Sequence, residues 1–262
     1  MDLGINGKAA IVTGGSQGIG KAIARSLAVE GVRVVICARG LDALQKTAAE
    51  LQGETNTEVV AVQADMTRTE DVKKLVAEAI KAFGAVDILV NNAASSHSAS
   101  FAELTDQDWL DHLNVKPVGY FRCAREAIPY MKQKRWGRII NIGGEAARGG
   151  GGYSSGAANV AIVNFTKKLS DELAPYGITV NALHPGPTRT QRRVQAYQRA
   201  AAQKGITLEA AEKEQIGRIP IGRLIEPEDI GNAVLFLASM KAAAVTGQVL
   251  GVDGGSVRGI YY

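Results

Sequence analysis

Residues 143–168, GGEAARGGGGYSSGAANVAIVNFTKK, hold the side chains best suited to proton transfer. A glycine-rich loop leads to Tyr153, and Ser154 and Ser155 follow at the start of a helical pattern. Phenol and hydroxyl groups can hydrogen-bond to a carbonyl or alcohol oxygen and exchange a proton with it. Lys167 follows Tyr153 by fourteen residues, about 21 Å along a helix, so these two side chains cannot act as a local pair.

A second group, TGGSQGIG at 13–20, has the spacing of a phosphate-binding loop. It follows a strand pattern and opens a helical pattern, which is the context that a dinucleotide site requires. We expect Gly14 to make the turn, Gly18 to leave room for the pyrophosphate, and Gly20 to let the helix pack against the strand. The helix N-terminus would then present unpaired N–H groups and a partial positive charge to the phosphates.

Seven short apolar runs, rich in β-branched residues, would position these groups. Their hydrophobicity is continuous rather than alternating, which is typical of strands covered on both faces. The predicted strands are 9–14, 32–38, 58–64, 86–92, 138–143, 178–183 and 248–254.

Helical patterns separate these strands. They cover residues 17–30, 41–52, 69–83, 106–131, 155–175 and 227–239. In the first of them, Ile19, Ile23 and Leu27 form a stripe that would face the sheet. The alternation predicts one domain over residues 1–262, an α/β fold with a Rossmann-like, doubly wound sheet of seven parallel strands in a three-layer α/β/α arrangement.

Two places depart from this regular pattern. Residues 188–217 are polar, helix-prone and poorly amphipathic, so we expect a helical lid or flap on the surface. Pro117, in LNVKPVGYF, removes the hydrogen bond to the carbonyl of Leu113 and should kink the helix expected over 106–131.

Several motifs together resemble the short-chain dehydrogenase/reductase family over nearly the whole chain. Besides TGGSQGIG they are NNAA at 91–94, Asp65-Met66, HPGPTRT at 184–190, GRLIEPEDIGNAVLFLAS at 222–239 and VDGG at 252–255. The resemblance implies a nicotinamide dinucleotide as cofactor. The cofactor-binding residues that it implies are Gly14, Ser16, Gln17, Gly18, Ile19, Gly20, Arg39, Asp65, Met66, Asn92, Ala93, Asn159, Pro185, Gly186, Thr188 and Thr190.

The residues after the second strand bear on which dinucleotide is bound. A carboxylate there would bind the adenosine ribose diol and repel a 2′-phosphate. This chain has Ala38 followed by Arg39, and a guanidinium pairs with phosphate in bidentate fashion. Against this, Gln17 stands where NADP-using members often carry a second basic residue. On the evidence of Ala38 and Arg39 we expect NADP(H) to be preferred, with NAD(H) possible. The alternative is that Arg39 is a solvated loop charge.

The family's reductases carry an Asn, a Ser and a Tyr-x-x-x-Lys pair, in which the ammonium lowers the phenol pKa. Here NVAIVNFTKKL at 159–169 matches the family's segment without a gap, which places Ser155 at the tyrosine position and Asn159 at the lysine position. Gly144 replaces the Ser, and Asn114 alone matches. The sequence thus predicts an atypical member with no ammonium group in the site. An ammonium about 4 Å from an ionised hydroxyl would stabilise it by roughly 4 kcal/mol at an effective dielectric of 20, and this site would lack that stabilisation.

Three residues are candidates for the missing proton donor. Tyr153 could swing in on its glycine run or be an exposed loop residue, and Glu145 could be a base or a solvated charge. His184, at the mouth of the predicted nicotinamide pocket, has a pKa suited to proton transfer or is a packed structural residue. The candidate catalytic residues are Asn114, Ser155, Asn159, Tyr153, Glu145 and His184.

Three functions remain open on this sequence. The first is an NAD(P)(H)-dependent oxidoreductase acting on a small carbonyl, alcohol or related C=X substrate with a non-standard proton donor. The second is a non-redox enzyme, such as a lyase, dehydratase or hydrolase. The third is a catalytically silent dinucleotide-binding subunit. The fold does not choose among them.

From the composition we expect this protein to bind a small-molecule substrate rather than a nucleic acid or a membrane. The net charge of +4 carries no dense basic cluster, so we expect no nucleic acid. No apolar stretch has membrane-spanning length and the N-terminus is no signal peptide, so we expect no membrane and a cytoplasmic location. Three His and two Cys make no metal-ligand set. The family resemblance implies a homotetramer or homodimer built on 106–131 and 155–175.

Overall fold

The computed structural model describes residues 2–94, 100–149 and 151–259, and its centre is a seven-stranded parallel sheet in the order β3-β2-β1-β4-β5-β6-β7. The strands are β1 (Ala9–Thr13), β2 (Arg33–Ala38), β3 (Val59–Gln63), β4 (Ile88–Asn91), β5 (Gly137–Ile142), β6 (Ile178–Pro185) and β7 (Val249–Val252). All seven predicted runs are strands, and the predicted doubly wound α/β fold is confirmed.

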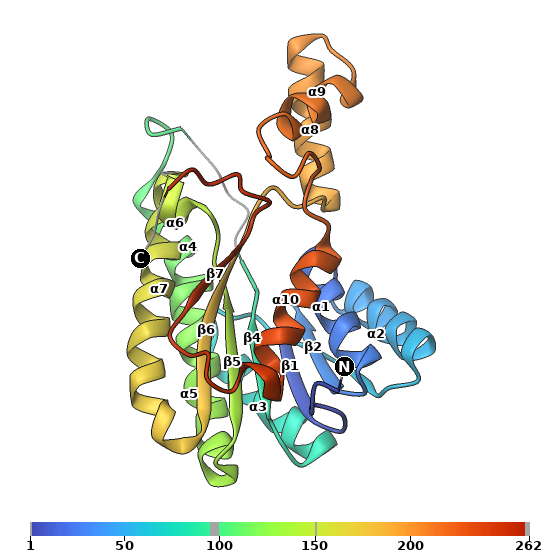
Figure 1. Ribbon diagram of the computed structural model, residues 1–262, viewed down its shortest axis with the longest axis vertical. Helices are drawn as coiled ribbons and strands as arrows, with labels where there is room; N and C mark the ends of the chain where they lie inside the picture. The colour runs from blue at the N-terminus through green and yellow to red at the C-terminus, as the bar shows by residue number, and fades with distance from the viewer. Residues whose placement is uncertain (1, 95–99, 150, 260–262) are drawn as a thin grey trace.

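Helices cover both faces of this sheet (Figure 1). One face carries α1 (Gly18–Val29), α2 (Leu41–Thr55) and α10 (Pro227–Ala238). The other carries α3 (Thr69–Phe83), α4 (Asp106–Val115), α5 (Pro117–Lys134) and α7 (Tyr153–Leu173). The short elements are α6 (Ala146–Gly149) and two 3₁₀ turns, η1 (Ala174–Tyr176) and η2 (Met240–Ala242). No helix within the described ranges is long and apolar enough to cross a membrane.

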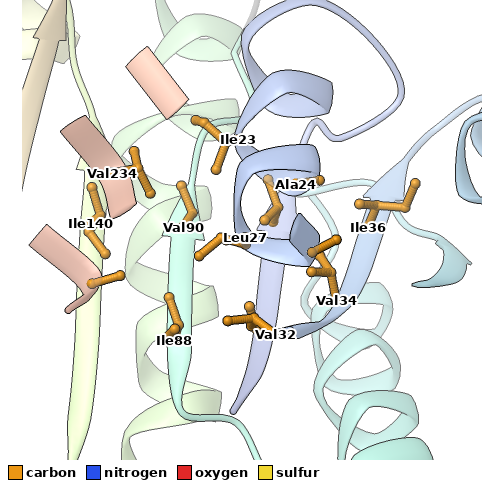
Figure 2. Close-up of a cluster of buried hydrophobic side chains, with 14 of the residues drawn as sticks. Ile23, Ala24, Leu27, Val32, Val34, Ile36, Ile88, Val90, Ile140 and Val234 are labelled. Carbon is orange, nitrogen blue, oxygen red and sulfur yellow. The ribbon is translucent and has the colours of Figure 1, made fainter. Parts of the chain in front are cut away.

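The first strand shows why the apolar runs are continuous. Ala10 and Val12 belong to the core beneath α1 and α10, whereas Ala9 and Ile11 belong to the core beneath α3 and α5. Successive side chains of a strand point to opposite faces, so a strand covered on both faces needs apolar residues at every position. Figure 2 shows the first of these cores, in which Ile23 and the other helix residues pack against strand side chains.

The helix expected over 106–131 is two helices. The first ends at Val115 and the second begins at Pro117, with Lys116 between them at φ −92° and ψ −81°. The predicted kink is therefore a complete break, because a proline cannot donate the hydrogen bond that would continue the helix. This break fixes where the Lys116 side chain leaves the backbone.

The polar segment 188–217 contains α8 (Gln191–Lys204) and α9 (Leu208–Ile216). The two helices pack on one another and project beyond the carboxyl ends of the strands (Figure 1). Thr190 and Thr207 cap their N-termini, and a small apolar cluster around Tyr197, Ile219 and Leu224 joins them to the following segment.

Candidate active site

The carboxyl edge of the sheet between β1 and β4 is the point where the chain's crossovers diverge to opposite sides. Crevices at such topological switch points are the usual ligand sites of open α/β sheets. The glycine-rich loop follows β1 at this edge. Gly14 has φ +68°, a left-handed conformation that favours glycine, so it makes the predicted turn.

Gly20 brings α1 against this loop. A Cβ atom at Gly20 would overlap the carbonyl oxygen of Gly14, and one at Gly14 would lie 3.0 Å from the Asn92 amide nitrogen. The close approach of α1 to β1 is as predicted. We call the loop that leads from β1 into α1, residues 14–18, the glycine cradle; at Gly14 it presents backbone rather than a side chain. The loop geometry therefore fits a pyrophosphate, although the binding roles of Ser16, Gln17, Gly18 and Ile19 stay predictions.

Asn92 and Thr13 hold the loop in place. The Asn92 amide donates to the carbonyls of Thr13 and Gly14 at 2.9 and 3.3 Å. The Thr13 hydroxyl accepts from the backbone N–H groups of Asn92 and Ala93 at 2.9 and 3.0 Å. The two neighbouring strand ends are thus tied together, which gives Asn92 a structural role beside its predicted contact with the cofactor.

Arg39 lies exposed directly after β2, and the Gln63 amide donates to its carbonyl oxygen at 2.7 Å. Asp65 and the buried Met66 follow the neighbouring strand β3 at the same edge. The Asp65 carboxylate accepts from both the backbone N–H and the hydroxyl of Thr67. The structure therefore brings the predicted adenosine contacts to one side of the glycine loop and leaves the Arg39 guanidinium accessible.

The predicted carboxamide-binding segment follows β6. Pro185 ends the strand, and the Gly186 N–H donates to the Val252 carbonyl of the last strand. The buried Thr188 hydroxyl donates to the Gly186 carbonyl at 2.9 Å, and Thr190 caps α8. Both threonine hydroxyls thus already take part in hydrogen bonds within the segment. A Cβ at Gly18 would be in ordinary van der Waals contact with Thr190, so this segment lies next to the glycine-rich loop.

Lys116 occupies the centre of the predicted catalytic region. Its side chain is 7% exposed, and its amine donates to Asn159 Oδ1 at 2.7 Å and to the Gly143 carbonyl at 2.9 Å. The prediction that no ammonium group would lie in the site is wrong in this respect, because an amine reaches Asn159 from a different element. Sequence reasoning missed it, although a lysine directly before the helix-breaking Pro117 was the available signal.

Burial changes how this amine titrates. Removal from water, with a smaller contribution from the positive charge of Arg192, lowers the pKa of Lys116 from 10.5 to about 7. The pKa of His184 is lowered from 6.5 to about 4, first by burial and then by Arg148 and Lys116. His184 is 1% exposed, and neither ring nitrogen has a hydrogen-bond partner in the part of the chain that the structure describes. His184 is therefore a neutral, buried imidazole near neutral pH.

Two glycines make room for this cluster. A Cβ at Gly143 would overlap the ring of His184, and a Cβ at Gly144 would lie 2.9 Å from the Asn159 amide nitrogen. A side chain at Gly143 would therefore collide with the buried imidazole, whereas one at Gly144 would require the Asn159 amide to shift.

The other candidates are dispersed around the cluster. The Asn114 amide oxygen accepts from Arg122 at 2.8 Å, and the half-buried Ser155 hydroxyl donates to the Gly152 carbonyl at 3.0 Å. Tyr153 is 53% exposed, with its ring 5.1 Å from that of Phe101. The structure does not join Asn114 or Tyr153 to Lys116, and their catalytic roles stay predictions.

Glu145 turns toward the C-terminal segment. Its carboxylate accepts a hydrogen bond from the Ser256 hydroxyl. Burial, and then the charge of Asp253, raises the pKa of Glu145. Within the described residues, no three His, Cys, Asp or Glu side chains gather closely enough to hold a metal ion.

Comparisons with known proteins identify similar chains. The family model described as Enoyl-(Acyl carrier protein) reductase matches residues 14–257. The 3-oxoacyl-[acyl-carrier-protein] reductase FabG of Thermotoga maritima is 34% identical over 97% of this chain and 99% of its own. The (2S)-[(R)-hydroxy(phenyl)methyl]succinyl-CoA dehydrogenase subunit BbsD of Thauera aromatica is 37% identical over 97% of this chain and 98% of its own.

Among solved structures, a variant of the actinorhodin polyketide ketoreductase with NADPH superimposes with a TM-score of 0.91. It shares 36% sequence identity and covers 96% of this chain and 98% of its own. The agreement extends from the glycine loop to the C-terminal strand. On its motifs, its strand order and these matches, the chain belongs to the short-chain dehydrogenase/reductase family.

Proposed function

We propose that this protein is an NADP(H)-dependent oxidoreductase that interconverts a small carbonyl compound, or a related C=X compound, with its reduced form by a non-standard proton transfer. The observation that carries the proposal is the position of a glycine cradle and a buried amine at the same carboxyl edge of one sheet. Bound NADPH would supply a hydride from its nicotinamide ring. The chain's own residues would position the substrate and move the proton.

The residues present fit such a cofactor. Gly14 and Gly20 carry no side chain where α1 meets the loop after β1, so backbone N–H groups at the N-terminus of α1 are open to phosphates. Arg39 is the accessible cation that would bind a 2′-phosphate. The actinorhodin ketoreductase, which has the same fold, is described as a complex with NADPH. Asp65, Met66, Asn92 and Ala93 would hold the adenosine and ribose side of the cofactor.

We also propose that the α8–α9 hairpin acts as a lid over the substrate. It stands next to the site, since α8 begins at Gln191, directly after the predicted carboxamide-binding segment. Its first turn carries Arg192 and Arg193, and their charges act on Lys116 and Glu145 respectively. Closure of such a segment would exclude water from the proton-transfer step.

A second candidate is a catalytically silent dinucleotide-binding subunit. The BbsD relative is described as a subunit of its dehydrogenase, and Ser155 and Asn159 stand where the family's Tyr and Lys are expected. In that case the chain would bind NADPH without turning over any substrate by itself.

The test is a nucleotide titration followed by a turnover screen. NADPH and NADH fluorescence titrations give the two dissociation constants, and the nicotinamide absorbance is then followed with a panel of 3-oxoacyl thioesters, ketones, sugars and imines. We expect tighter NADPH binding and oxidation of NADPH by at least one carbonyl class. NADPH binding without turnover would support the silent subunit, and product formation without an absorbance change would support a non-redox enzyme.

Exposed apolar side chains on the outer helices support a homodimer or homotetramer. Leu110, Phe121 and Val160, on α4, α5 and α7, are 57%, 47% and 53% exposed. Their burial against a second copy would remove apolar surface from water. Light scattering coupled to size-exclusion chromatography measures the assembly, and a monomer at micromolar concentration would contradict the proposal.

A further inference from the structure

Lys116 has hydrogen-bond acceptors around it but no anionic partner in the described chain. Its amine donates to two neutral oxygens, Asn159 Oδ1 and the Gly143 carbonyl. A buried ammonium is usually paired with a carboxylate, because removing a charge from water is costly. The arrangement around Lys116 instead satisfies an amine in either protonation state.

The number of hydrogens on the nitrogen shows why. An ammonium carries three N–H groups, of which Asn159 and Gly143 take two, so one N–H is left to donate. A neutral amine carries two N–H groups, both taken by the same oxygens, so its lone pair is left to accept. Among the described residues, one position on the nitrogen of Lys116 is therefore left open for proton exchange while the other two contacts persist, which is what a general acid–base group requires.

We propose that Lys116 is the general acid and base of this site, taking the place of a catalytic phenol. The inference rests on the proposed function. In the direction of reduction, the substrate carbonyl carbon would gain the hydride that bound NADPH supplies, leaving NADP⁺, while the C=O π electrons move to oxygen. That oxygen takes a proton from the Lys116 ammonium, and the neutral amine regains a proton from water. Oxidation of the alcohol runs through the same steps in reverse.

The electrostatic surroundings suit this role. Of the residues that the structure describes, the charged and titratable ones that act on the amine are Arg192 from α8 and His184 from β6, and Arg148 from α6 acts on His184. His184 stays neutral, so it adds no repulsion near neutral pH. With its pKa lowered to about 7, Lys116 populates both protonation states under physiological conditions, whereas an ordinary lysine is protonated.

Asn159 is a positioning residue in this scheme. It is 5% exposed, comes from α7, and has no proton to exchange near neutrality. Its amide oxygen fixes the amine without adding a negative charge that would raise the lysine pKa. The exposed Lys168 on the same helix offers a matched control lysine outside the site.

The experiment compares Lys116→Gln, Lys116→Arg and Lys168→Met with the wild-type protein. Gln keeps two N–H donors for the neighbouring oxygens, and Arg keeps the charge, but neither can exchange a proton near neutrality. We expect all three variants to fold and to bind NADPH within about threefold of wild type. We expect kcat to fall about 10²–10⁴-fold in both Lys116 variants, the usual size of a general acid–base contribution, and to be unchanged in Lys168→Met.

The pH dependence of kcat distinguishes proton transfer by Lys116 from a purely structural role. Wild-type kcat for reduction should fall as the pH rises through about 7, because the ammonium is the proton donor. In ¹³C-lysine NMR of the protein without cofactor, the Lys116 signal, identified by its loss in Lys116→Gln, should titrate at the same pH. A signal that titrates above pH 9, or a Lys116→Arg variant with wild-type kcat and pH profile, would overturn the inference alone. A wild-type protein that turns over nothing would overturn the proposed function and this inference with it.

Discussion

The Lys116 amine donates a hydrogen bond to Asn159 Oδ1 across 2.7 Å, which joins the break between α4 and α5 to the N-terminal part of α7. The two residues are separated by 43 positions in the sequence. The contact brings a titratable nitrogen to the helix position at which the family resemblance predicts a lysine, while the residue at that position is an amide.

Exchanging the two side chains tests this contact. Asn159→Lys would place a second ammonium beside Lys116, a repulsion of about 4 kcal/mol at 4 Å and an effective dielectric of 20. We expect this variant to lose about 2–4 kcal/mol of unfolding free energy at pH 6, from the same repulsion, and less at pH 9, where one amine is neutral. The double variant Lys116→Asn with Asn159→Lys should recover most of the loss.

Chemical denaturation of the four proteins in this double-mutant cycle measures the coupling. Asn164→Lys, which adds a lysine on the exposed face of α7, is the matched control and should change stability little. Additive effects of the two single substitutions would show that Lys116 and Asn159 do not interact in solution.

The glycine loop gives a steric prediction. In Gly20→Ala the added methyl group would overlap the Gly14 carbonyl, so α1 must move away from β1. We expect NADPH affinity to fall at least about tenfold and stability to fall by about 1–3 kcal/mol, as for other overpacked sites. Gly40→Ala is the control, because a Cβ there meets nothing within 4 Å and Gly40 has φ −86°. Unchanged NADPH fluorescence titrations for Gly20→Ala would refute the close approach.

Arg39 should distinguish the two dinucleotides. Arg39→Ala removes the accessible cation after β2, and a charge-assisted hydrogen bond is worth about 1.5–3 kcal/mol. NADPH binding should therefore weaken about 10- to 100-fold, while NADH binding changes less than about threefold. Arg68→Ala, at another exposed arginine near Asp65, should leave the ratio of the two dissociation constants unaltered. An equal loss for both nucleotides in Arg39→Ala would assign Arg39 no part in phosphate recognition.

Protein stability should rise with pH in two windows. The pKa of His184 is about 4 in the folded protein and 6.5 as its ordinary value, so the unfolded chain binds more protons between these limits. The stabilisation is present above pH 6.5 and is lost as the pH falls toward 4. The pKa of Lys116 is also lowered by folding, so stability should likewise rise with pH between about pH 7 and 10.5.

Urea unfolding between pH 4 and 10 measures both contributions. His184→Asn should flatten the slope below pH 6.5, and Lys116→Gln should flatten the slope above pH 7. From the size of the His184 shift, we expect a change of at most about 3 kcal/mol across the acidic window. Parallel curves for wild type and His184→Asn would mean that the imidazole is not held neutral in the folded state.

The sequence by itself determined the features that depend on local spacing. Continuous apolar runs between helical patterns required strands buried on two faces, and β1 has that arrangement. The turn at Gly14 and the close approach at Gly20 lie within one short loop, so glycine spacing was enough to predict them. Pro117 similarly predicted a kink in the helix expected over 106–131, although the structure has a complete break there.

Only the tertiary structure decided which side chains meet in the predicted catalytic region. No ammonium group was predicted beside Asn159 because the family's register places Asn159 itself at the lysine position, yet the Lys116 amine reaches it from the break between α4 and α5. That encounter depends on the exact direction of the chain at the α4–α5 break and on the packing of α7 beside it. The titration of Lys116 depends on burial by several elements at once, and burial is a property of the assembled fold rather than of residue spacing.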